Sequence, residues 1–189
     1  MSNKLVPVLR HAVGSSVVVS VGWCVFRCSV DGLPRKEALR AGMKVLSIDG
    51  ARPQFIKAAV LSRVLSRSHH EVLLHTGQHY DDCMSGQFLR ELALPTADYE
   101  LGVGSGTHAQ QTAKMLIGIE EAIVREQPDA MVVFGDTNST LAGALAAAKV
   151  GIKVAHVEAG LRSFNRSMPE EVNRVLVDHL STWLFCPSD

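Results

Sequence analysis

The sequence has no excess of charge of either sign, because 19 lysines and arginines balance 19 aspartates and glutamates. A chain without net positive charge has no long-range attraction for nucleic acid or for an anionic membrane, so we expect neither as a partner. No apolar run approaches the roughly 18 residues of a membrane-spanning helix. With 47% apolar and 20% charged residues, the composition is typical of a soluble globular protein.

Residue patterns that hold metals or dinucleotides are also missing. Four cysteines occur at irregular spacing, namely Cys24, Cys28, Cys83 and Cys186. The first two form C-x3-C without a second pair, which is a poor zinc pattern and predicts reduced thiols in a cytoplasmic protein. Only His75 and His79 stand at H-x-x-x-H spacing, without the further ligands of a zinc pattern, so we expect no metal site. GVGSG at 102–106 differs from the dinucleotide motif G-x-G-x-x-G.

The first 42 residues differ in character from the rest of the chain. Residues 15–26, SSVVVSVGWCVF, weakly resemble a secretory signal but lack a convincing small-residue cleavage site. A good first strand, KVLSI, follows Met43 directly. We therefore predict an atypical extension over 1–42, either disordered or a mis-assigned start, and a domain over 43–189.

Strand and helix patterns alternate from Met43 onward. Continuous apolar runs predict strands at 44–48, 71–75, 130–134, 153–157 and 182–186. Helical spacing predicts helices at 53–67, 85–92, 108–127, 139–150 and 169–180. This alternation implies an α/β fold with a Rossmann-like parallel sheet that is covered by helices on both faces. The chain stops just after its last predicted strand, which indicates the first half of a longer two-domain protein.

Charged side chains follow several of the predicted strands. Ligands of such sheets bind beyond the carboxyl ends of the strands, so Asp136 and Glu158, which follow successive strands, can converge there. Arg52 and Lys57 stand at the start of the first predicted helix, where cations and free backbone amides favour an anion. The alternative is that these two cations are ordinary surface residues.

Three of the carboxylates also have a structural explanation. Asp136 stands at a helix start, where it can act as a cap, and Glu158 can form a structural ion pair with His156 or Arg162. Ser167 and Glu170 fit the S-x-x-E capping box. That box leaves Glu171 unexplained. Together, these carboxylates and cations suit a reaction in which a phosphate leaves and positive charge develops on a sugar.

Several segments together identify a resemblance. GARPQFIK, TGQHYD, GDTNSTLAGALAAA, HVEAGLRSFNR and MPEEVNRVLVDHLS closely resemble the non-hydrolysing UDP-N-acetylglucosamine 2-epimerase family, nearly continuously over 43–189. The resemblance implies the N-terminal half of a GT-B-like two-domain fold, with the C-terminal domain absent from this chain. It also implies interconversion of UDP-GlcNAc and UDP-ManNAc for surface polysaccharide precursors, without a metal or nicotinamide cofactor, in a homodimer.

The resemblance assigns roles to particular residues. It implies catalytic acids at Asp136, Glu158 and Glu170, and substrate-binding residues at Arg52, Lys57, Arg162 and Glu171. Gln78 and His79 match the stretch that binds an activating second UDP-GlcNAc in bacterial members, although the glutamine expected near Gly106 is absent.

Four alternatives remain open at this point. GARPQFIK and RSFNRSMPEE lean toward the branch that acts on UDP-2,3-diacetamido sugars and their uronic acids. The same architecture also occurs in glycosyltransferases and in hydrolysing epimerases. Finally, the chain can be an inactive fragment that lacks the UDP-binding domain.

Overall fold

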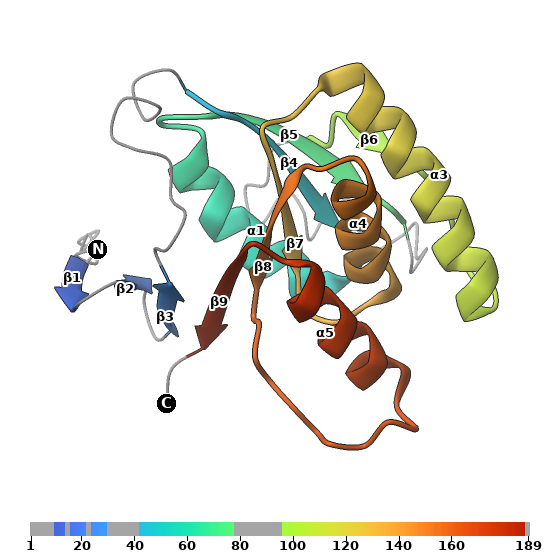
Figure 1. Ribbon diagram of the computed structural model, residues 1–189. Coiled ribbons are helices and arrows are strands. Elements are labelled where there is room, and N and C mark those ends of the chain that lie inside the picture. The colour runs from blue at the N-terminus through green and yellow to red at the C-terminus, as the bar shows by residue number, and fades with distance from the viewer. Residues whose placement is uncertain (1–9, 14–15, 22–23, 30–41, 78–95, 188–189) are drawn as a thin grey trace, which may run out of the picture.

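A computed structural model describes residues 10–13, 16–21, 24–29, 42–77 and 96–187 (Figure 1), the first three ranges by their backbone alone. The described strands form one sheet with the order β1-β2-β3-β9-β8-β7-β4-β5-β6. The parallel strands are β4 (Lys44–Asp49), β5 (His70–His75), β6 (Tyr99–Glu100), β7 (Ala130–Phe134), β8 (Lys153–Val157) and β9 (Trp183–Pro187).

The order of the parallel strands places a crossover in the middle of the sheet. In chain order the six strands read 6-5-4-1-2-3, which is the doubly wound Rossmann order. The chain first moves outward from β4 through β5 to β6, and then returns to β7 on the other side of β4. The switch point therefore lies between β4 and β7, where ligands of such folds bind.

Helices cover both faces of the parallel sheet, as predicted (Figure 1). Helix α1 (Arg52–Leu65) packs on one face, and α3 (His108–Glu126), α4 (Asn138–Lys149) and α5 (Pro169–Leu180) pack on the other. Neighbouring residues of β4 point to opposite faces of the sheet. Val45 belongs to the core under α1, and Leu46 belongs to the core under the other three helices.

The predicted elements agree closely with the structure. The strands at 130–134 and 153–157 and the helix at 169–180 have the predicted bounds, and the other predicted elements that lie in the described residues differ by a few residues at most. The predicted helix at 85–92 lies outside the described residues. No helix in the described ranges combines the length and the apolar character that a membrane crossing needs.

Three further strands extend the sheet beyond β9. They are β1 (Arg10–Val13), β2 (Ser16–Val21) and β3 (Cys24–Ser29), and they pair antiparallel in sequence order. Strand β3 joins β9 through two residue pairs, Phe26 with Pro187 and Arg27 with Cys186. The domain boundary at Met43 stays a prediction.

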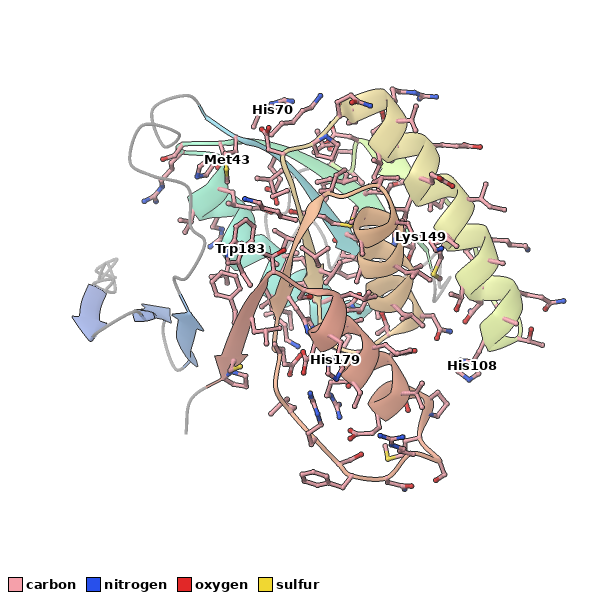
Figure 2. The ribbon with its side chains drawn as sticks, viewed as in Figure 1. Met43, His70, His108, Lys149, His179 and Trp183 are labelled. Atoms are coloured by element: carbon pink, nitrogen blue, oxygen red, sulfur yellow. The ribbon has the colours of Figure 1, made fainter. Side chains whose placement is uncertain are left out.

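The two ends of the parallel strands are distinct in Figure 2. Met43 and His70 mark the end at which β4 and β5 begin, and His108 lies at the opposite end, where helix α3 begins. The loops that follow β4, β7 and β8 belong to the same end as His108, because these strands are parallel. This carboxyl edge carries the predicted site.

Candidate active site

The loops after β7 and β8 contact each other at the carboxyl edge. Gly135 directly follows β7 with a φ of 66°, and a Cβ added there would lie only 3.3 Å from Oε2 of Glu158. Its backbone amide also donates to the carbonyl of Val157, at the end of β8, at 2.9 Å. The Glu158 carboxylate therefore rests against the residue that precedes Asp136, as the strand order predicts.

Glu158 pairs with Lys57 across the carboxyl edge. The Nζ of Lys57, on α1, donates to Oε2 of Glu158. The backbone of Glu158 is left-handed, with a φ of 73°, and the amides of Glu158 and Ala159 both donate to the carbonyl of Phe185, at 3.0 and 3.1 Å. The sequence-based choice of His156 or Arg162 as the cation beside Glu158 was wrong, because both of those side chains bind Asp178 instead.

Asp136 is tied to helix α5 by its side chain and by its carbonyl. Its carboxylate forms an ion pair with the guanidinium of Arg174. Its carbonyl accepts a hydrogen bond from Nδ2 of Asn173 at 3.0 Å. Each of the two strand-end carboxylates, Asp136 and Glu158, therefore has one cation as its partner, and each cation comes from a different helix.

Glu171 holds the loop before α5 rather than facing outward. It is only 2% exposed, and its carboxylate accepts from the amides of Ser163 and Phe164 at 2.9 and 3.2 Å and from Nη1 of Arg174 at 2.9 Å. The Ser163 amide is the main cause that holds the pKa of Glu171 below its ordinary value. Glu171 thus orients Arg174 toward Asp136.

The remaining predicted residues occupy different positions. Glu170 is exposed in the first turn of α5, four residues before Arg174 and thus on the same side of the helix. Arg162 directs Nη2 to Asp178 Oδ2 at 2.6 Å. Arg52 opens helix α1, but its side chain lies outside the described structure, as do Gln78 and His79.

The capping box predicted for α5 was wrong. The residue that caps the helix is Met168, and no side chain caps it. The hydroxyl of Ser167 instead donates to Oδ1 of Asn165 at 2.7 Å. Capping therefore does not explain the presence of Glu170.

Sequence reasoning missed a set of buried amides beneath the site. Asn138, in the first turn of α4, donates to Oε1 of Gln111 in the first turn of α3 at 3.0 Å and accepts from Nδ2 of Asn173 on α5 at 3.4 Å. These contacts hold three helices together near their amino ends, where free backbone amides create positive potential. Asn173 and Arg174 are close in sequence to Glu170 and Glu171, which was the available signal.

The sequence analysis also did not identify Gln54 as a residue of the site. It is 3% exposed, and its Oε1 accepts from the amides of Gly50 and Ala51 at 2.8 and 3.1 Å. Its Nε2 donates to the carbonyl of Phe134 at 2.6 Å and to Oγ1 of Thr137 at 2.9 Å. This side chain joins the loop after β4 to the loop after β7, across the switch point.

Among the residues that the structure describes, no group of three or more His, Cys, Asp or Glu side chains could hold a metal ion. The functional groups at the carboxyl edge are instead carboxylates with adjacent cations. Such groups can transfer a proton and can stabilise charge that develops on a bound substrate. The fold and the site together define a Rossmann-like α/β domain whose carboxyl edge carries carboxylates paired with cations.

Comparison with known proteins names the family. A sequence model described as UDP-N-acetylglucosamine 2-epimerase matches residues 62–189, and the chain belongs to that family. A protein of Methanococcus maripaludis named UDP-N-acetylglucosamine 2-epimerase homolog is 57% identical over 147 residues, which are 78% of this chain and 41% of that protein. The UDP-2,3-diacetamido-2,3-dideoxy-D-glucuronate 2-epimerase of Pseudomonas aeruginosa is 54% identical over 148 residues, 77% of this chain and 42% of that protein.

Solved structures show the same likeness. The UDP-GlcNAc 2-epimerase of Methanocaldococcus jannaschii, solved in complex with UDP-GlcNAc and UDP, matches with a TM-score of 0.72 and 54% identity, over 74% of this chain and 39% of that one. The match confirms the predicted fold class, a Rossmann-like domain similar to part of a GT-B-like protein. The chain spans about two fifths of the length of these relatives.

Proposed function

We propose that the chain is the N-terminal domain, over residues 43–189, of a non-hydrolysing 2-epimerase of UDP-N-acetylglucosamine. The observation that carries the proposal is the pairing of Asp136 with Arg174 and of Glu158 with Lys57, in two loops that touch at the switch point. The relatives that are 52–57% identical and named as such epimerases support the same reaction.

The reaction needs two chemical events on the sugar. A base removes the proton from C2 while the bond from C1 to the UDP oxygen breaks, and its electron pair leaves with UDP. A double bond between C1 and C2 results, giving 2-acetamidoglucal. UDP then adds back to C1, and a proton returns to C2 on the opposite face. Overall, one proton is lost and one regained, and nothing is oxidised.

The charged groups of the edge suit these events. Asp136, Glu158 and Glu170 supply carboxylates that can carry the C2 proton and stabilise positive charge at C1. Lys57 and Arg52, in the first two turns of α1, supply cations that suit the diphosphate. The contacts of Arg162 and Glu171 favour an indirect role, in which they hold the loop rather than touch the substrate.

The test is the reaction of UDP-GlcNAc in D₂O with the complete gene product that contains this chain, followed by NMR. We expect UDP-ManNAc that carries deuterium at C2. Asp136→Asn should abolish the exchange, whereas Glu120→Gln, which neutralises an exposed carboxylate on α3, should not. Release of free ManNAc would indicate a hydrolysing enzyme, and an absence of exchange in the wild type would refute the proposal.

A second substrate is favoured by one specific finding. The Pseudomonas aeruginosa relative named for UDP-2,3-diacetamido-2,3-dideoxy-D-glucuronate is as similar as the relatives named for UDP-GlcNAc, at 54% identity against 52–57%. The chemistry at C1 and C2 would be the same with either sugar. Parallel measurement of kcat/KM on both substrates distinguishes them.

We further propose a homodimer that works in the cytoplasm on precursors of surface polysaccharide. The irregular cysteines are consistent with a reducing compartment. Helix α3 presents Ile117 and Val124, which are 61% and 64% exposed, on its outer side, and exposed apolar side chains of this kind favour association. Light scattering should give a dimer for the wild type and a smaller species for Ile117→Glu.

A further inference from the structure

We propose that His156 and Asp178 form a positioning unit, which sets the separation between the loop that carries Asp136 and the loop that carries Glu158. This inference rests on the proposed function. Neither residue belongs to the predicted acid–base set, and both are buried beneath it, His156 completely.

The imidazole of His156 bridges two elements. It projects from the residue before the last of β8, and its Nε2 lies 2.6 Å from the carbonyl of Gly135, the residue before Asp136. Its Nδ1 lies 2.7 Å from Oδ1 of Asp178, on α5. The ring therefore ties the loop after β7 to helix α5 through the strand between them.

Asp178 extends the unit to the loop after β8. Its Oδ2 accepts from the amide of Gly160 at 3.1 Å and from Nη2 of Arg162 at 2.6 Å. Gly160 lies two residues after Glu158 and has a left-handed φ of 81°. One histidine and one carboxylate thus fix the carbonyl of the residue before Asp136 and the amide of the second residue after Glu158.

Charge accounts for the stability of this buried arrangement. The carbonyl of Gly135 only accepts hydrogen bonds, so Nε2 of His156 must carry a proton to bond to it. The carboxylate of Asp178 also accepts, so its bond to Nδ1 is made when Nδ1 carries a proton. Burial raises the pKa of Asp178, but hydrogen bonds from His156 and Arg162 outweigh it and leave the pKa below its ordinary value. Hydrogen bonds to both acceptors would place a proton on each ring nitrogen of His156, opposite the carboxylate of Asp178.

The geometry permits a substitution that removes the charge and keeps every hydrogen bond. In Asp178→Asn, the amide oxygen can take the place of Oδ2 and accept from Gly160 and Arg162. The amide nitrogen can take the place of Oδ1 and donate to Nδ1 of a neutral His156, whose Nε2 still donates to Gly135. Asp178→Ala removes the bonds to His156, Gly160 and Arg162.

The experiment compares both variants in the complete gene product. Positioning predicts that Asp178→Asn retains kcat within about threefold, and that Asp178→Ala lowers kcat about 100-fold with KM little changed, because a misplacement of about 1 Å costs that much. Val154→Ala, a buried truncation at the start of the same strand, controls for lost stability and should leave kcat near the wild-type value. Equal loss in Asp178→Asn and Asp178→Ala, full activity in Asp178→Ala, or a matching loss in Val154→Ala would overturn the inference.

A second measurement does not depend on turnover. In ¹⁵N spectra of the histidine-labelled protein, with His156→Gln for assignment, we expect both ring nitrogens of His156 to be protonated in the wild type. In Asp178→Asn, only Nε2 should carry a proton. If the wild type lacks epimerase activity but shows this signature, the proposed reaction fails while the buried pair stands. A neutral His156 in the wild type would contradict the pair itself.

Discussion

Gln54 tests how the loops of the site are held together, because its buried side-chain amide forms hydrogen bonds to both the loop after β4 and the loop after β7. We expect Gln54→Leu, which keeps a similar volume, to destabilise the protein strongly. The amides of Gly50 and Ala51 would lose their acceptor in a buried place. The carbonyl of Phe134 would keep one donor, because Oγ1 of Thr140 also binds it, at 2.6 Å.

The magnitude follows from the two amides. A buried donor that loses its partner costs about 1–3 kcal/mol, so two of them cost about 2–6 kcal/mol. For a protein of this size, about 2–4 °C of melting temperature is lost per kcal/mol, which gives a fall of about 4–24 °C. The measurement is thermal unfolding followed by far-ultraviolet circular dichroism.

Gln110→Leu is the matched control for this reasoning. Gln110 holds the same position in the first turn of α3, where its amide oxygen accepts from the backbone amide of Thr107 at 3.2 Å, but it is exposed, so water can replace the lost acceptor. We therefore expect Gln110→Leu to melt much closer to the wild type than Gln54→Leu. A melting temperature for Gln54→Leu within about 2 °C of the wild type, or equal losses in both variants, would refute the argument.

Three further predictions concern the carboxylates. Gly135→Ala and Gly151→Ala both place a Cβ at positive φ, so each should lower the free energy of unfolding by about 1–2 kcal/mol. Only Gly135→Ala should also lower kcat, because its Cβ would meet Glu158, whereas nothing lies within 4 Å of a Cβ at Gly151. Equal kcat in the two variants would contradict this. Lys57→Met should lower kcat by about 10²–10³ yet change unfolding by less than about 1 kcal/mol, because both partners of the Lys57–Glu158 pair are about one third exposed. Glu171→Gln should be less stable than the wild type above pH 4.5, and this difference in stability should close at lower pH. The reason is that the stability contributed by a carboxyl with a lowered pKa is lost as pH falls through that pKa. A stability difference that stays constant from pH 7 to pH 3 would argue against a role for the carboxylate.

The architecture was predictable because its signals are local. The apolar strand at 130–134 is buried at every position, and continuous burial is what an unbroken apolar run indicates. On α3, the helical spacing of apolar residues puts Met115 and Ile119 on one face, and both are fully buried. The short strand β6 was missed, because two residues give no periodicity to detect.

The partners within the site were less predictable because they depend on tertiary geometry. Sequence order placed Asp136 and Glu158 at one edge, but the choice of cation depends on side-chain direction. Lys57 reaches Glu158 from α1, 101 residues away in the chain, whereas Arg162, only four residues away, turns to Asp178. Proximity in sequence favoured the wrong partner for Glu158.

Glu158 has a consequence for how this edge can evolve. Its left-handed φ of 73° is unfavourable for a side chain with a Cβ, by about 1–3 kcal/mol, and glycine would relieve that strain. Loss of the Lys57 contact offsets little of this gain. Selection for stability alone would therefore favour glycine at position 158. A glutamate is retained there only while its carboxylate contributes to function.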